Sequence, residues 1–255
     1  MTAAPITNPY GDLCAEIYDL DKPPGSLFDI AYYTQALKGV EGPILEAAVG
    51  TGRLFIPLVE AGLDMVGFDH SRAMLDICQG HLEARGLKAP LHQARFQDFE
   101  FAERFGAIIV PTSSFILIDQ FDEAMAVLGR FRDHLRPGGQ LILDLPPMDF
   151  LGRNSDGLRV WTAANGDILR MDSRKVELDG VGQRRVNHDL YQRWRDGQLV
   201  DQQLEVFAYR SWGLKEFEMA LVAAGFEIVS VGANYRPGRA PRSGDQIFNF
   251  VARRP

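Results

Sequence analysis

The sequence predicts an α/β protein: a largely parallel sheet flanked by helices, with an antiparallel β insertion after the fifth strand. Between residues 43 and 145, short apolar runs alternate with helical patterns, as in repeated βαβ units. After Pro146 and Pro147, apolar and polar residues alternate with period two and are punctuated by Asn-Gly and Asp-Gly dipeptides. The 255 residues, 46% apolar and 24% charged, suffice for one such domain with an insertion.

The first part of the chain is expected to alternate five strands with three helices. The helical patterns each end near a Gly or Pro that stops a helix, and Ser71 is a natural N-cap for the second of them. The expected strands are 43–47, 64–68, 89–94, 107–110 and 140–145, and the expected helices are 54–61, 71–85 and 122–135.

The second part is expected to form an antiparallel meander and then return to the first sheet. Its runs are 158–164, 168–178, 183–194 and 199–210, with turns at Asn165-Gly166, Asp179-Gly180 and Asp196-Gly197. A helix at 214–224 ends at Gly225, and two strands follow at 227–231 and 246–252. Residues 1–145 and 211–255 are therefore expected to form the main domain, and residues 146–210 the insertion.

Charge and composition exclude several classes of protein. Residues 1–150 hold 11 Lys and Arg against 21 Asp and Glu, net −10, whereas residues 151–255 have a net charge of +3. This disfavours nucleic acid as a partner, because its binders concentrate basic residues. No apolar run approaches the roughly 18 residues that span a bilayer, and residues 1–10 lack the segments of an export signal. Cys14 and Cys78 fit neither a disulfide framework nor a metal site. We expect a cytoplasmic protein that binds neither a membrane nor nucleic acid and holds no metal.

A glycine-containing turn after the first expected strand indicates a nucleotide-type ligand. Gly50 and Gly52 let the backbone approach a ligand closely, at the carboxyl edge of the sheet. Seventeen residues after Gly52, Asp69 ends the second strand and can accept hydrogen bonds from both ribose hydroxyls. Phe55 replaces the third glycine of a dinucleotide fingerprint, which weakens the NAD interpretation. Glu46 would repel a pyrophosphate, so a ligand with an ammonium or sulfonium group is favoured.

On these residues the sequence resembles the class I S-adenosylmethionine-dependent methyltransferases. Residues 45–53 look like their first motif, residues 66–75 like their second, and residues 135–139 like the turn before their fifth strand. The resemblance covers about residues 10–150. It implies a Rossmann-like seven-stranded sheet of order 3-2-1-4-5-7-6 with the last strand antiparallel, and S-adenosyl-L-methionine as the cofactor.

The resemblance also implies roles for individual residues. Glu46, Gly50 and Gly52 would surround the methionyl part, and Asp69 would bind the ribose. Tyr18 and Tyr33 look like lid tyrosines that reach the cofactor's carboxylate, although packing of an N-terminal helix explains them equally well. The full set of expected cofactor-binding residues is Tyr18, Tyr33, Glu46, Ala48, Gly50, Gly52, Arg53, Asp69, His70, Met74, Phe96 and Pro111.

Three features depart from the family pattern, one of which is that Phe105 and Gly106 stand where an acidic residue usually precedes the fourth strand. Ala48 stands where a glycine is usual, which the turn tolerates if its φ is negative. Arg95 stands where many relatives have an acidic residue, and a guanidinium cannot accept a hydrogen bond from the adenine amino group. Phe96 can still stack on the base, and Asp98 is the alternative acceptor.

The insertion is expected to cover the methyl-transfer site and hold a small acceptor. His188 and Tyr191 are candidates for positioning the acceptor or removing its proton, although a lone histidine on a strand is more often an ordinary core or surface residue. An insertion at this point resembles sugar N-methyltransferases and glycine N-methyltransferase-like enzymes, which favours N-methylation of a small amine. Three alternatives remain: an O-methyltransferase of a small metabolite, an NAD-dependent oxidoreductase, and a non-catalytic methyltransferase-like protein that forms a homodimer through the insertion.

Overall fold

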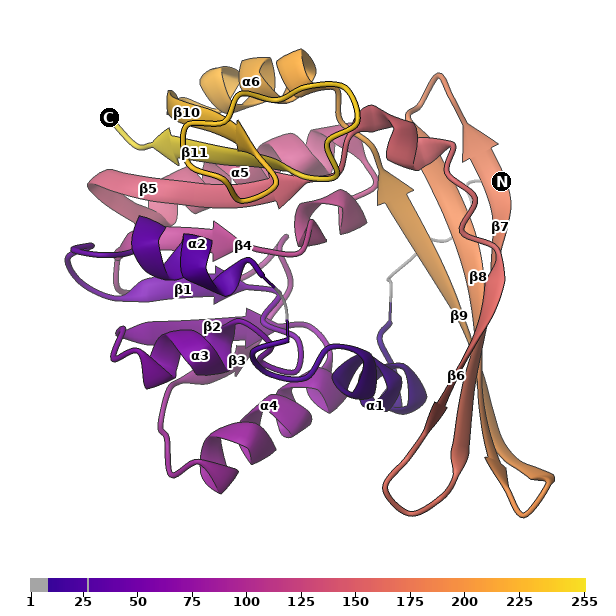
Figure 1. Ribbon diagram of the computed structural model, residues 1–255. Helices are drawn as coiled ribbons and strands as arrows, with labels where there is room; N and C mark the ends of the chain where they lie inside the picture. Colours follow the sequence, from indigo (N-terminus) through magenta and orange to yellow (C-terminus); the bar gives the residue numbers. More distant parts are fainter. Residues whose placement is uncertain (1–8, 27) are drawn as a thin grey trace.

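The computed structural model describes residues 9–26 and 28–255 and contains two separate sheets with helix α1 between them (Figure 1). Residues 1–8, on which most of the expectation about an export signal rests, lie outside the described residues. Within the described ranges, no helix is long and apolar enough to cross a bilayer. No group of three or more metal-ligating side chains comes together in that same part of the chain.

The main sheet has seven strands in the order β10-β11-β5-β4-β1-β2-β3. β11 runs antiparallel to both of its neighbours, β5 and β10, whereas the pairs among β1 to β5 are parallel. Read from the other edge, this order is the expected 3-2-1-4-5-7-6, so the predicted topology is confirmed. The strands are β1 Ile44–Ala47, β2 Met65–Asp69, β3 Leu91–Gln93, β4 Phe105–Val110, β5 Leu135–Leu145, β10 Glu227–Ala233 and β11 Phe248–Arg253.

Helices cover both faces of this sheet, which explains why β1 and β2 are buried along their whole length. One buried cluster joins α5 and α6 to the sheet, and a second joins α2, α3 and α4 to its other face. As predicted, Ser71 caps α4 by accepting a hydrogen bond from the Met74 N–H. The helices are α2 Ile30–Ala36, α3 Phe55–Glu60, α4 Arg72–Ala84, α5 Phe121–His134 and α6 Leu214–Ala223, with 3₁₀ turns η1 Ser114–Leu117 and η2 Met148–Leu151.

The insertion forms a second sheet of four antiparallel strands in the order β6-β7-β8-β9. Asp196 and Gly197 have φ values of +50° and +76°, as expected for a tight hairpin turn. The Asp179-Gly180 turn differs from the prediction: it is a four-residue loop, because Asp179 Oδ1 accepts hydrogen bonds from the backbone N–H of residues 181 and 182. The strands are β6 Gly157–Thr162, β7 Ile168–Asp179, β8 Arg184–Arg195 and β9 Gln198–Arg210.

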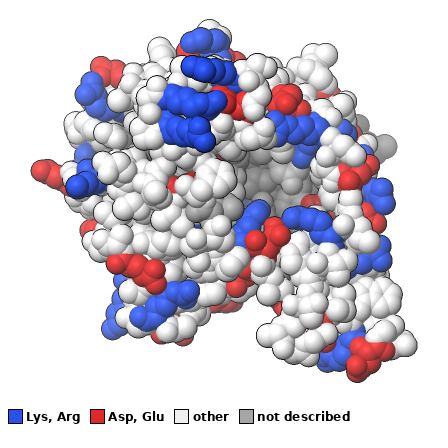
Figure 2. Space-filling model, in the orientation of Figure 1, with Lys and Arg blue, Asp and Glu red and all other residues white. Residues whose placement is uncertain are grey.

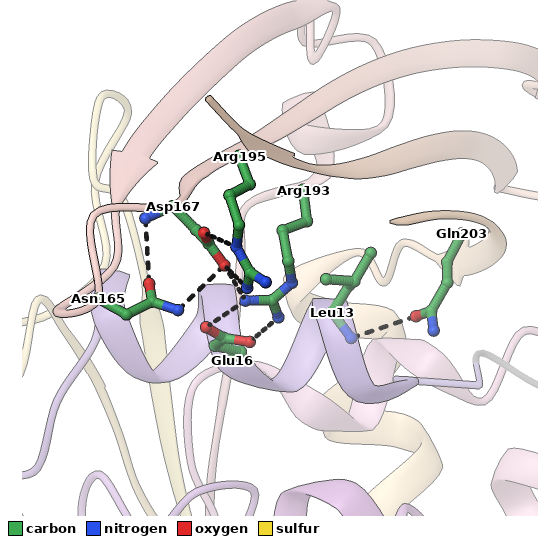
Figure 3. Close-up of polar contacts among 7 residues, drawn as sticks. All are labelled: Leu13, Glu16, Asn165, Asp167, Arg193, Arg195 and Gln203. Atoms are coloured by element: carbon green, nitrogen blue, oxygen red, sulfur yellow. Dashed lines mark hydrogen bonds and ion pairs between the residues drawn. The ribbon is translucent and has the colours of Figure 1, made fainter. Parts of the chain in front are cut away.

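Helix α1, Asp12–Asp21, is fixed to the inner face of the second sheet. Arg193 on β8 forms an ion pair with Glu16 of the helix (Figure 3). Gln203 Oε1 on β9 accepts a hydrogen bond from the Leu13 N–H at 3.2 Å, so the sheet satisfies an N–H group of the first helical turn. On its other side, α1 contacts α4. The helix therefore connects the two sheets.

Candidate active site

Two cavities meet at the N-terminal segment and α1. The first, of about 270 Å³, lies at the carboxyl ends of β1 to β4. The second, of about 560 Å³, lies between α1 and the inner face of the second sheet. Tyr10 and Tyr18 line both. Both positively charged side chains (Lys and Arg) and negatively charged ones (Asp and Glu) surround the hollow between the two sheets (Figure 2).

Asp69 is the polar centre of the first cavity. Its Oδ2 accepts a hydrogen bond from the Gly50 N–H and its Oδ1 one from the Ser71 N–H, both at 2.9 Å. The side chain is therefore fixed by the loops that follow β1 and β2, and each oxygen keeps a lone pair for a ligand. His70 lines the same cavity, with its Nδ1 3.4 Å from Asp69 Oδ1.

The turn after β1 contains three residues with positive φ. Gly50 has φ +58°, and a Cβ built on it would clash with nothing and would make an ordinary contact with Tyr18 Cε1 at 3.9 Å. Gly52 has φ +89°, but a Cβ there would lie 2.8 Å from Cys78 Sγ. Gly50 therefore lines the cavity, whereas Gly52 is a packing glycine that allows α4 to approach the turn.

Apolar side chains form the far wall of the first cavity. Phe68 and Phe96 meet edge to face, with ring centroids 5.9 Å apart. Met74 and Ala94 complete this wall. An aromatic ring with apolar neighbours is a suitable surface for a flat heterocycle.

Comparisons with known proteins agree with this geometry. A family described as methyltransferase domain matches residues 44–139. Cypemycin N-terminal methyltransferase from Streptomyces is 26% identical over 232 residues, which are 89% of this chain and 90% of that relative. Residues 44–139 therefore form a methyltransferase domain.

Two further similarities support the family of this methyltransferase. A dTDP-3-amino-3,4,6-trideoxy-alpha-D-glucopyranose N,N-dimethyltransferase from Streptomyces venezuelae is 30% identical over 148 residues, 58% of each chain. The solved structure of a sugar N-methyltransferase from Streptoalloteichus covers the whole of both chains, with a TM-score of 0.72 and 24% identity. An amino pentose methyltransferase from Micromonospora, whose solved structure matches with a TM-score of 0.63 and 20% identity over 89% of each chain, is described with bound S-adenosylmethionine.

The described residues fit this cofactor. The space above Gly50 accommodates a close backbone approach, and Asp69 offers free lone pairs to a diol. Glu46 is 2% exposed, and its Oε2 lacks a hydrogen-bond partner among the described residues. Burial raises the pKa of Glu46 to about 8, and the nearby Arg53 guanidinium only partly offsets this effect. A buried acceptor without a donor is suited to a ligand that carries an ammonium group.

Besides Glu46 and Gly52, three more expected cofactor residues do not line the first cavity. Arg53 is 3% exposed and donates two hydrogen bonds to Asp29, at 2.7 and 2.8 Å. Tyr33 is fully buried and donates to Asp144 Oδ2 at 2.9 Å. Pro111 is also buried and is not among the residues that line the first cavity. These side chains support the loops of the methyltransferase, and the prediction of direct cofactor contact is not supported for them.

Asp98 does not replace the missing acidic residue of the family. Its Oδ1 accepts a hydrogen bond from the Arg95 backbone N–H at 2.9 Å, so it closes the turn after β3. Gln97, Asp119 and Glu123 line the cavity on this side. Sequence reasoning missed these three residues, since no motif spacing marks them.

The condition for tolerating alanine at position 48, a negative φ, is not met. Its φ is +57°, a left-handed conformation that costs an L-residue roughly 1–2 kcal/mol. The Ala48 backbone lines the cofactor cavity, so the strain is located at the site itself.

We therefore expect Ala48→Gly to stabilise the methyltransferase by about 1 kcal/mol, because glycine adopts this φ without strain. Urea unfolding measures the change. The control is Ala126→Gly on the exposed side of α5, which should destabilise by about 1 kcal/mol. Destabilisation by both variants would contradict the role assigned to the backbone strain.

The second cavity combines aromatic walls with charged groups, and it separates the two residues nominated as catalytic. Tyr191 is 4% exposed and lines the cavity, and its hydroxyl accepts a hydrogen bond from Cys14 Sγ at 3.3 Å. Burial raises the pKa of Tyr191, so this phenol stays neutral and can position an acceptor but not remove its proton at neutral pH.

His188 lies on the opposite face of the second sheet. Its neighbours Asn187 and Asp189 both line the cavity, and successive side chains of a strand point to opposite faces. His188 therefore does not face the second cavity, whereas Asp189, which is 6% exposed, does. The period-two pattern contained this information, because Asp189 and Tyr191 share a face.

Proposed function

We propose that this methyltransferase methylates the nitrogen of a small amine that binds in the second cavity. The observation that carries the proposal is the wall common to both cavities, formed by Tyr10 and Tyr18. The Tyr10 ring contacts Phe207 on β9 at a centroid distance of 4.9 Å and His70 after β2 at 6.0 Å. A molecule against β8 and β9 would therefore face the cofactor at this junction.

Within the first cavity, Asp69 would accept hydrogen bonds from the ribose, and Gly50 and Ala48 would present their backbone to the methionyl part. His70, Met74 and Phe96 would enclose the adenine, while Tyr18 would lie at the junction. Glu46, behind the wall, would compensate the positive charge of the methionyl ammonium.

Bound S-adenosylmethionine supplies a methyl group on a positively charged sulfur: a neutral amine forms the N–C bond as the S–C bond breaks, and the positive charge passes to nitrogen. The walls of the two cavities must align the acceptor with this group, an effect worth up to about 7–11 kcal/mol in favourable models. An amine must lose a proton before it can react, so a group that accepts this proton assists.

Two observations favour nitrogen over oxygen as the acceptor atom. Asp21, Asp156 and Asp189 line the second cavity, against Lys22 and Arg159, so its carboxylates outnumber its cations. Similar proteins have names that state methylation of nitrogen, among them the sugar N,N-dimethyltransferase and the sugar N-methyltransferase described above. The family assignment removes the oxidoreductase alternative, and an O-methyltransferase remains the second outcome of the test.

The test is a panel of small amines, each paired with the alcohol of the same shape, incubated with the protein and S-adenosylmethionine. Mass spectrometry detects S-adenosylhomocysteine and the methylated product. We expect methylated amines, at a rate that rises with pH through the pKa of the bound amine. Methylation of the alcohols alone would replace the proposal with O-methylation.

Glu46 is expected to release a proton when the cofactor product binds. If its carboxyl faces the ammonium of the bound cofactor product, binding S-adenosylhomocysteine at pH 7 should release a proton from Glu46, whose pKa is about 8 in the free protein. Calorimetry in buffers of different ionisation enthalpy should detect this release. Glu46→Gln should abolish it and weaken binding at least tenfold, as for a hydrogen bond to a charged group worth about 1.5–3 kcal/mol. Exposed Glu60→Gln is the control, and equal proton release in both variants would contradict the role.

The homodimer through the insertion stays a prediction. The outer face of the second sheet exposes large apolar side chains, including Leu158 at 53%, Val160 at 56% and Leu204 at 60%. Single exposed apolar residues are ordinary, whereas a group on one sheet face is typical of an interface. Sedimentation velocity measures the state: we expect a dimer, and a monomer at all concentrations would contradict this prediction.

A further inference from the structure

Three polar side chains form a row across the inner face of the second sheet. Ser173 on β7 lies opposite Asp189 on β8, which lies opposite Glu205 on β9. All three are buried, with exposed fractions of 5%, 6% and 3%. Ser173 Oγ donates to Asp189 Oδ1 at 2.5 Å. The row lies behind and along the second cavity, which Ser173 and Asp189 line.

This row places two carboxylates directly opposite one another, which is unfavourable for like charges on paired strands. Among the described residues, no Lys, Arg or His nitrogen lies within 4.0 Å of either carboxylate. Burial raises the pKa of both carboxyl groups, and Arg159, Arg185 and His188 lower that of Asp189 only from a distance. The fold therefore bears an electrostatic cost that neutral side chains of the same shape would avoid.

Two buried acceptor atoms, one in this row and one beside it, lack hydrogen-bond donors among the described residues. The Asn187 side chain, 3% exposed, lines the cavity next to Asp189, and its Oδ1 has no hydrogen-bond partner in the described part of the chain. Glu205 Oε2 is buried and has no partner of hydrogen-bond geometry among the described residues, although the Tyr10 N–H and the Cys14 thiol lower the pKa of this carboxyl. Its Oε1 accepts a hydrogen bond from the Gly11 N–H at 2.7 Å. Buried acceptors are usually satisfied, so these atoms indicate a ligand that brings N–H donors.

We propose that Asp189, with Glu205 behind it and Asn187 beside it, is the subsite that binds the acceptor as an ammonium ion and removes one of its protons. This inference rests on the proposed function and names the residues that select an amine. The proton moves from the ammonium nitrogen to Asp189 Oδ2, and the N–H bonding pair stays on nitrogen as the lone pair that reacts. Asp189 becomes a neutral carboxylic acid and later returns the proton to water. An alcohol of the same shape brings no positive charge, so it gains less from this subsite.

Groups that face the row complete its electrostatics. Cys14 on α1 and Tyr191 on β8 are neutral at physiological pH, because burial raises the pKa of both. Tyr209 on β9 is neutral for the same reason. Arg159 on β6 forms an ion pair with Asp21 and therefore compensates that carboxylate first. The negative charge of the row is left for a ligand.

The first experiment measures the melting temperature of Asp189→Asn and Glu205→Gln at pH 4 and pH 8. When folding raises the pKa of a carboxyl group, the folded protein becomes less stable as the pH rises above the unfolded pKa near 4. The wild type therefore bears the cost of burying these carboxylates at pH 8 and not at pH 4. Both variants should melt about 2 °C or more above the wild type at pH 8 and together with it at pH 4. The control Asp201→Asn, at an exposed position of β9, should change neither value. Lower melting temperatures at both pH values would assign the row a purely structural role and overturn the proposal.

The second experiment uses 2-phenylethylamine and the matched alcohol 2-phenylethanol as probes, at pH 8, on protein saturated with S-adenosylhomocysteine. The amine should raise the melting temperature of the wild type and of Asp201→Asn more than the alcohol does, and Asp189→Asn should lose this difference. Equal effects of the two probes on the wild type would overturn the subsite. If Asp189→Asn does not fold, Glu205→Gln decides, because a glutamine can still accept the Gly11 N–H.

Different results would refute the proposed function and the Asp189 subsite. Absence of S-adenosylhomocysteine binding would refute the cofactor site and with it the proposed function. Binding and amine methylation that persist at wild-type rates in Asp189→Asn and Glu205→Gln would leave the function intact and refute this subsite alone.

Discussion

Gly50→Val should reduce the affinity for S-adenosylhomocysteine more than a hundredfold. Gly50 has φ +58° and lines the first cavity, and its N–H is held by Asp69. A branched side chain there is strained and occupies the space beside Tyr18 that the ligand needs. Calorimetry measures the loss.

The matched control for this variant is Gly86→Val. Gly86 has φ +64° with nothing within 4 Å of a Cβ, and it follows α4 at the surface. It incurs a similar backbone strain without entering the cavity, so it should lower stability and leave affinity unchanged. If Gly50→Val kept the wild-type affinity for S-adenosylhomocysteine, Gly50 would be only a structural residue of the turn.

Asp69→Asn should weaken S-adenosylhomocysteine binding about ten- to a hundredfold, the range of 1.5–3 kcal/mol for a hydrogen bond to a charged group. Both carboxylate oxygens accept backbone N–H groups, so the amide nitrogen of an asparagine must face one donor with another. The variant loses the charge and loosens one of the loops after β1 and β2.

Asp98→Asn is the control for the Asp69 variant, because Asp98 closes the neighbouring turn after β3 without lining the cavity. Its affinity should stay at the wild-type value. Equal affinities of all three proteins in calorimetry would show that Asp69 does not bind the cofactor.

Local patterns in the sequence predicted most of the fold. The Gly and Pro stops and the apolar runs located the βα units, and the turn dipeptides located the insertion, because these signals depend on residues close together in the chain. β5 is longer than predicted, starting at Leu135 instead of residue 140, because Leu135 pairs with Phe105 across a register shift. That pairing is tertiary and has no local signal.

The expected cofactor residues that lie away from the cavity have no local signal either. Tyr33 bonds Asp144, 111 positions away, and Arg53 bonds Asp29, 24 positions away, so motif spacing could not distinguish supporting residues from lining ones. The second sheet illustrates a different limit. Period two shows which residues share a face, but the inward face depends on the register and on α1.

A crystal structure of the ternary complex would show whether the acceptor binds between α1 and the second sheet. The crystals should contain S-adenosylhomocysteine and an amine that the protein methylates. We expect the amine nitrogen beside Tyr18 at the junction of the two cavities, with Asp189 as its acidic neighbour. An acceptor bound on the outer side of the first cavity, against Arg95 and Glu123, would contradict it.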